Sequence, residues 1–194
     1  MSVGRKVVAG VLTAGLMALA MWLYTFKPHI EAGEQNPITS SGRLGSVVDN
    51  RVFSVKVDRV DVARSLTKAS SFSGPEVTPS IGLFLIVHAN IKSNHKPFQP
   101  GHVRLVTGGG LSYDESGRAA LPSTTDDYQP MLWAPATYIF ELPRDRLAGA
   151  RLIIGESAFL NQLSAETSID LGMSGDRAAQ LSTHPATTYT LKTP

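Results

Sequence analysis

Cysteine is absent from this 194-residue chain, which excludes disulfides, thiolate metal sites and cysteine nucleophiles. The chain also lacks the G-x-S-x-G, H-E-x-x-H, P-loop and G-x-G-x-x-G patterns that mark hydrolases, zinc proteases and nucleotide-binding proteins. The spaced D-x-D-x-D-G loop of calcium sites is missing as well. We therefore expect no enzymatic activity and no cofactor.

Basic residues are in little excess, with 18 Lys and Arg against 16 Asp and Glu. Two of the basic residues, Arg5 and Lys6, precede a long apolar run, and no acidic residue does. Apart from these two, basic and acidic residues are equal in number. Because nucleic-acid binding needs a clustered basic excess, we expect no nucleic-acid partner.

The apolar run covers residues 7–26, which carry no charged side chain. A helix of this length spans about 30 Å, the thickness of the hydrocarbon core of a bilayer. The basic pair in residues 1–6 favours a cytoplasmic N-terminus, and Trp22 and Tyr24 suit the opposite interface. We therefore expect a transmembrane signal anchor in the plasma membrane, with the rest of the chain extracytoplasmic and the lipid bilayer as one partner.

A cleaved signal peptide is the alternative, because Ala18-Leu19-Ala20 has the small-x-small form of a cleavage site. The apolar run continues through 21–26, however, whereas a cleavage site usually ends such a run. An uncleaved anchor is the leading interpretation, and cleavage after Ala20 stays open. Both interpretations place the following domain outside the cytoplasm.

The remainder divides by composition into a linker, a domain and a tail. Residues 27–45 are polar and rich in Gly, Pro and Ser, which indicates a tether. Residues 46–173 contain short β-type runs separated by turn residues, which favours an all-β sandwich. Residues 174–194 form a Thr- and Pro-containing tail, either extended or ending in a strand.

Two runs give the strongest strand signals. Residues 52–57 alternate, and the pattern then shifts phase to Val60 and Val62, which predicts a β-bulge. In 81–92 every second residue from Ile81 to Ile91 is apolar. The opposite face begins with Gly82 and Phe84 and ends with polar residues, as expected for a central strand that emerges from cover.

The order of these runs resembles a known family. The segments that carry the resemblance are VFSVKV, LFLIVHANIKSNHKPF, HVRLVTGGGLSYD, YIFELP, ARLIIG and SIDLGM. They are similar to the bacterial extracytoplasmic immunoglobulin-like domains of unknown function in secreted and membrane-anchored Gram-positive proteins, which are related in fold to mycobacterial immunoprotective antigens. The chain departs from them by a longer stretch at 119–133. The resemblance implies an immunoglobulin-like β-sandwich and supplies no site residues.

One loop, 128–135, concentrates large apolar side chains. It contains Tyr128, Met131, Leu132 and Trp133, and two interpretations stay open: the loop caps the core, or it contacts a partner, since aromatic and Met side chains are enriched at interfaces. The five histidines are expected to be surface residues, because a metal site needs three or four ligands.

The expected function is a membrane-anchored binding or accessory module of the bacterial cell envelope, which contacts another membrane or envelope protein. The anchor, the neutral domain and the missing catalytic motifs motivate it. The alternative is a carrier or sensor of a small apolar or envelope ligand, held in the sandwich or under the loop.

Overall fold

The computed structural model describes residues 13–22, 36–68, 74–119, 127–157 and 164–191. The chain divides into two compact units, Met1–Gln35 and Asn36–Pro194. In the first unit, residues 13–22 are helical. No helix among the described residues is both long and apolar enough to cross a bilayer. The remaining parts of the predicted segment 7–26 lie outside the described residues.

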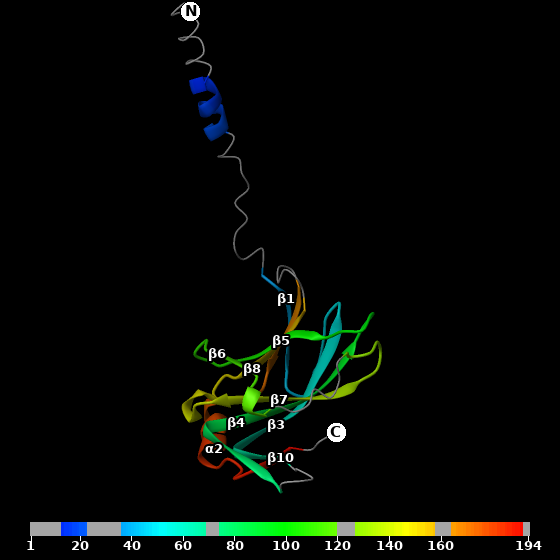
Figure 1. Cartoon of the computed structure of the whole chain (residues 1–194), viewed down its shortest axis with the longest axis vertical. Helices are drawn as coiled ribbons and strands as arrows, with labels where there is room; N and C mark the ends of the chain where they lie inside the picture. Colours follow the sequence, from blue (N-terminus) through cyan, green and yellow to red (C-terminus); the bar gives the residue numbers. More distant parts are fainter. Residues whose placement is uncertain (1–12, 23–35, 69–73, 120–126, 158–163, 192–194) are drawn as a thin grey trace, which may run out of the picture. The chain divides into compact units, whose positions relative to one another are not determined.

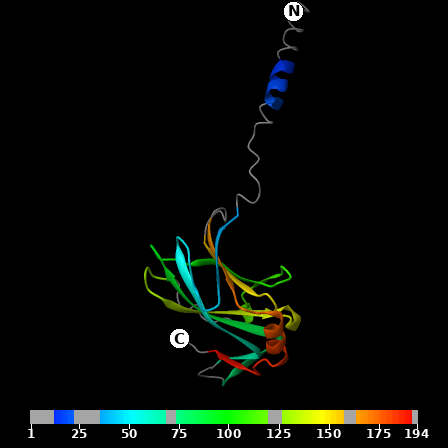
Figure 2. The same cartoon turned by 180° about the vertical axis from the view of Figure 1, so that it is seen from behind.

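The second unit is a two-layer β-sandwich with short helices (Figures 1 and 2). Its elements are β1 Ile38–Arg43, β2 Val47–Asp49, β3 Phe53–Lys68, β4 Glu76–Ser93, β5 Pro100–Val106, β6 Ser112–Asp114, η2 Gly117–Ala119, β7 Ala134–Leu142, η3 Arg144–Arg146, β8 Arg151–Glu156, β9 Ala165–Asp170, α2 Gly175–Thr183 and β10 Tyr189–Leu191. This architecture confirms the prediction of a β-sandwich.

Each layer is one sheet. Sheet 1 has the strand order β1-β9-β8-β5-β6, and sheet 2 has the order β10-β3-β4-β7, with β2 also paired to β3. Two pairs are parallel, β1 with β9 and β10 with β3, and the other pairs are antiparallel. Each parallel pair therefore joins a strand from the early part of the unit's sequence to a strand from its late part.

The core lies between the inner faces of the two sheets. Alternate residues of β4, from Leu83 to Ile91, are fully or almost fully buried there, opposite sheet 1 residues such as Leu105, Leu152 and Ile169. This is the face that the sequence pattern predicts. The register shift between Val57 and Arg59 in the β3–β4 pair likewise confirms the predicted bulge.

The outer face of sheet 2 is apolar at one end only. Phe84 and Ile86 are fully buried in a second, smaller cluster with Leu191 of β10, whereas His88 further along β4 is half-buried. The outer face of β4 thus changes from buried to partly exposed along the strand, as the sequence of 81–92 predicts. Side chains of β10 contribute to this cover, since Leu191 belongs to the cluster and Tyr189 packs against it.

One prediction for β4 is wrong. Ile81 was expected to share the buried face, but 96% of it is exposed. The pairing of β3 with β4 shifts register here, from Ala63 opposite Phe84 to Ser65 opposite Pro79. The extra β4 residues form a bulge, which turns Ile81 out of the strand alternation.

The predicted domain boundaries, 46–173, are too narrow. Strand β1 lies in the stretch assigned to the linker, 27–45, because it pairs with β9 along its whole length. The stretch assigned to the tail, 174–194, contains α2 and β10. Ser174 caps α2, where its hydroxyl accepts a hydrogen bond from the Arg177 backbone N–H.

Candidate functional site

The loop that the sequence singled out divides into a buried part and an exposed part. Tyr128 is 6% exposed, and its backbone exchanges hydrogen bonds of 2.8 and 3.0 Å with Phe98. Met131, Leu132 and Trp133 are 74%, 61% and 40% exposed. Tyr128 therefore matches the core-capping interpretation, while the other three residues form a contiguous apolar surface.

Backbone hydrogen bonds hold the exposed part against the end of β4. The Met131 N–H donates to the Ser93 carbonyl at 2.9 Å, and the Ser93 N–H donates to the Gln129 carbonyl at 3.3 Å. Met131 has a φ of 61°, in the left-handed region that residues other than glycine rarely adopt. A non-glycine residue in this region costs conformational energy and is found mainly where the surroundings fix it.

This apolar surface borders a groove of about 1240 Å³. The groove is formed by β1, the β2–β3 turn, the end of β4 and the loop, with contributions from β8 and β9. Its lining residues are Ile38, Ser40, Val47, Asp49, Asn50, Arg51, Val52, Ser54, Lys92, Asn94, His95, Met131, Trp133, Glu156 and Ala165. We call it the loop groove.

A hydrogen-bonded network of short polar side chains forms one wall of the loop groove. The Asp49 carboxylate accepts from the Ser54 hydroxyl at 2.5 Å and from Asn94 Nδ2 at 2.9 Å. Asn94 Nδ2 also donates to the Asn50 carbonyl at 2.7 Å. These hydrogen bonds, first from Ser54 and then from Asn94, lower the pKa of Asp49, so the wall carries a fixed negative charge.

A cation lies over the aromatic ring of the loop. Lys92 Nζ is 5.3 Å from the centroid of the Trp133 ring, within the range of a cation–π interaction. Lys92 thus contacts the exposed apolar surface, while Asp49 on the same groove is anionic. The loop groove therefore combines an exposed apolar surface with charged side chains of both signs.

A cluster of polar side chains surrounds His88 on the outer face of sheet 2. His88 Nε2 is 3.0 Å from Asp61 Oδ2, 3.2 Å from the Tyr189 hydroxyl and 3.4 Å from Arg59 Nη2. All three groups lie at the same ring nitrogen, and the contacts join β3, β4 and β10.

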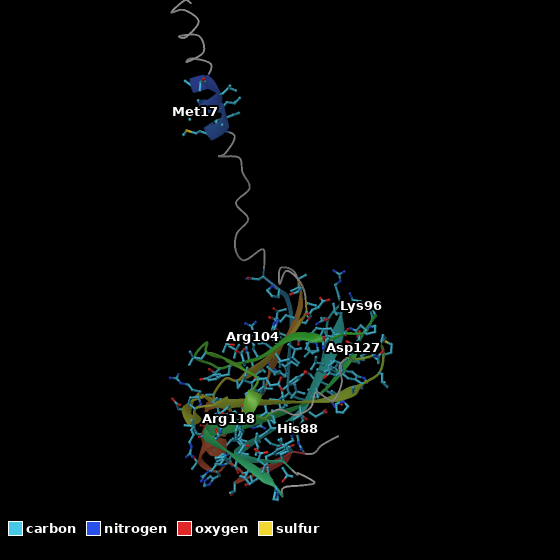
Figure 3. The ribbon with its side chains drawn as sticks, in the orientation of Figure 1. Met17, His88, Lys96, Arg104, Arg118 and Asp127 are labelled. Atoms are coloured by element: carbon cyan, nitrogen blue, oxygen red, sulfur yellow. The ribbon has the colours of Figure 1, made fainter. Side chains whose placement is uncertain are left out.

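The other histidines do not assemble a metal site within the described ranges. His102 lies 3.2 Å from Glu166 on sheet 1, and His95 borders the loop groove. Across the described part of the chain, no group of three or more His, Cys, Asp or Glu side chains is placed to hold a metal ion. Figure 3 labels His88 of β4 and Arg104 of β5, two strands that belong to different sheets. His29 lies outside the described residues.

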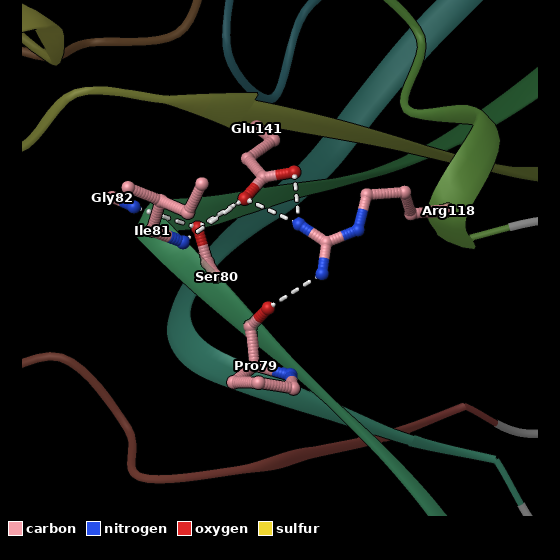
Figure 4. Close-up of polar contacts among 6 residues, drawn as sticks. All are labelled: Pro79, Ser80, Ile81, Gly82, Arg118 and Glu141. Carbon is pink, nitrogen blue, oxygen red and sulfur yellow. Dashed lines mark hydrogen bonds and ion pairs between the residues drawn. The ribbon is translucent and has the colours of Figure 1, made fainter.

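A carboxylate network fixes the bulge at Ile81 (Figure 4). Glu141 Oε1 accepts from the Ser80 hydroxyl at 2.8 Å and from the Ile81 N–H at 3.1 Å. Both Glu141 oxygens are 3.2 Å from Arg118 Nη1, and Arg118 Nη2 donates to the Pro79 carbonyl at 3.0 Å. These contacts tie Glu141 of β7 to the backbone of the bulge, where Ile81 is exposed.

Sequence reasoning finds the exposed apolar residues of the loop but misses the polar wall beside them. Asn94 directly follows β4. Its partner Asp49 lies 45 positions away in the chain, and no local pattern links the two. Strand β3 brings them together, because it pairs with both β2 and β4.

Comparisons with known proteins bear on the fold alone. No family model and no curated protein matches the chain. Solved structures similar to it include an uncharacterised β-sandwich protein from Clostridium difficile 630, with 12% identity and a TM-score of 0.41 over 74% of this chain and 99% of that one. A conserved hypothetical protein from Bacillus anthracis has 18% identity and a TM-score of 0.42, and the match covers 64% of this chain and 93% of that one. The secreted protein MPT63 from Mycobacterium tuberculosis has 19% identity and a TM-score of 0.44, and the match covers 69% of this chain and 97% of that one.

Proposed function

We propose that the chain is a non-enzymatic, membrane-anchored binding module of the cell envelope, whose loop groove contacts another membrane or envelope protein. Residues 7–26 serve as the anchor, and the sandwich, of the immunoglobulin-like kind, is extracytoplasmic. One observation carries the proposal: Met131, Leu132 and Trp133 stand exposed side by side on a loop that is hydrogen-bonded to β4. Hydrophobic side chains held in this way match the preorganised anchors of protein interfaces.

The dimensions of the groove favour a protein segment over a small ligand. Pockets for small molecules usually measure about 300–1,000 Å³ and enclose most of the ligand. The loop groove measures about 1240 Å³ and is bordered by side chains that are 40–74% exposed. This supports the accessory role over the carrier role.

Site-specific photocrosslinking in membranes tests the proposal. A photoreactive amino acid replaces Leu132 in one sample and Val77, which is 56% exposed on β4, in a matched control. We expect a discrete crosslinked species of higher mass from position 132 and none from position 77. Exchanging Trp133 for Ser in the first sample should weaken that species.

Native mass spectrometry of the same preparation separates the two roles. A reproducible protein partner identified in the crosslinked species supports the accessory role. A small bound mass without any crosslinked protein would support the carrier role. No crosslink from position 132, together with a bare chain mass, would contradict both.

A further inference from the structure

A second, smaller pocket lies on sheet 1 and shares no lining residue with the loop groove. It has a volume of about 300 Å³ and is formed by Ser41, Gly42, Arg43, Arg151, Ser168 and Asp170. In β9, Thr167 and Ile169 are fully buried, and Ile169 belongs to the main core cluster. Because side chains alternate along a strand, Ser168 and Asp170 face outward from the sandwich.

The strand register places two arginines on either side of one aspartate. Arg43 of β1 is opposite Asp170 of β9, and Arg151 of β8 is opposite the same Asp170. Neighbouring strands lie about 4.8 Å apart, so the two arginines stand about two strand spacings from each other. The next outward row contains Ser41 opposite Ser168.

The side-chain donors of this pocket have no acceptors among the described residues. Within the described residues, the guanidinium groups of Arg43 and Arg151 form no ion pair, and the hydroxyls of Ser41 and Ser168 form no hydrogen bond. Asp170 differs, because its Oδ1 accepts from the Gly172 N–H at 2.8 Å. The pocket therefore offers two guanidinium groups and two hydroxyls against one carboxylate that is already engaged.

We propose that this pocket binds the oxyanion of a phosphoryl group. A planar guanidinium donates two parallel hydrogen bonds to phosphate oxygens, and hydroxyls supply further donors. Two arginines outweigh the single carboxylate, so the pocket carries a net positive charge. Ser168 is only 8% exposed, the most buried of the lining residues.

A change at Asp170 distinguishes an oxyanion pocket from two arginines that only stabilise the sheet. If the two arginines only stabilise the sheet through Asp170, an Asp170→Asn change removes their shared counter-charge and affects stability alone. In an oxyanion pocket the same change removes a repulsive charge, while the amide oxygen can still accept from the Gly172 N–H. The variant should then bind the anion several-fold more tightly.

The test is a titration of the full chain in micelles of an uncharged detergent, followed by backbone amide chemical shifts. One arm uses inorganic phosphate, and the other uses glycerophosphoglycerol, the soluble headgroup of a phospholipid. Saturable shifts confined to β1, β8 and β9 are expected. Binding of inorganic phosphate alone indicates a free phosphate or monoester as the source, and equal binding of the diester indicates a lipid headgroup.

Variants decide the outcome. Arg43→Gln and Arg151→Gln should each weaken binding about tenfold, as expected for losing one charge-assisted contact on a partly exposed surface. Arg64→Gln, which removes an exposed charge from sheet 2, should leave the affinity unchanged. The proposal is overturned if neither probe gives saturable shifts, if Arg64→Gln weakens binding as much as the pocket variants, or if Asp170→Asn does not tighten it.

Discussion

Truncation of Tyr128 to alanine tests the division of the loop into a core-capping part and an exposed part. The Tyr128 ring is 6.4 Å from the Phe98 ring, which stacks on Phe53 at 4.2 Å. Tyr128 is 6% exposed, so the variant loses a buried ring and leaves a cavity, at a cost of about 3–5 kcal/mol in the free energy of unfolding. Leu132→Ala, at a residue 61% exposed, should change it by less than about 0.5 kcal/mol.

Urea unfolding followed by circular dichroism measures both variants. With a slope of about 2 kcal/mol per molar urea, Tyr128→Ala should lower the unfolding midpoint by about 1.5–2.5 M. Leu132→Ala should move it by less than about 0.25 M on the same slope. The slopes of the variants should equal that of the parent protein, which excludes a change in the unfolded state as the cause.

Two results would refute the reasoning. If Tyr128→Ala moves the midpoint by less than about 0.5 M, the ring does not fill the core. If Leu132→Ala costs as much as Tyr128→Ala, the loop is covered as a whole, and its exposed residues are no candidate for a binding surface. A Tyr128→Phe control, which keeps the ring, should stay close to the parent.

Three further outcomes are expected. Burial lowers the pKa of His88 below its ordinary value of 6.5. The contribution of the neutral His88 to stability is therefore present above pH 6.5 and is lost as the pH falls through the lowered pKa. Urea midpoints at pH 7.5 and pH 5.5 should differ less in His88→Gln than in the parent. Gly82→Ala places a Cβ against a backbone carbonyl of β7 and should cost roughly 3 kcal/mol or more, whereas Gly117→Ala, with open space around it, should be nearly neutral in the same assay. Intact mass analysis of the membrane fraction should show a chain that begins at Met1, and a start at Met21 would contradict the anchor.

The long strands are the part of the fold that the sequence predicts best. In β3 and β4 the inner face packs into the core, so apolar residues recur at every second position and the bulge near Val57 appears as a change of phase. The alternation fails at Ile81, where pairing with β3 changes register. A residue pattern reports the face of a regular strand and contains no information about where a distant partner strand forces a bulge.

Strands at the sheet edges are predicted poorly for a related reason. The sequence of β1, ITSSGR, contains one large apolar residue, and Ile38 is itself 54% exposed. Its structure depends on hydrogen bonds to β9, which are independent of side-chain type. The groove wall has the same origin, since Asp49 and Asn94 meet only where β3 pairs with both β2 and β4. Composition alone distinguishes the loop residues Met131 to Trp133, so the sequence is enough to single them out as a candidate contact surface.

The parallel pairing of β1 with β9 has a consequence for the order in which the chain can fold. Thr39 of β1 contacts Glu166 across 127 positions of sequence. At a synthesis rate of about 5–20 residues per second, roughly 6–25 seconds separate the appearance of these two residues. Sandwiches dominated by such distant pairings also fold slowly, in milliseconds to seconds. During this interval β1 has no strand to join, so a newly made chain depends on protection from aggregation until its last strands arrive.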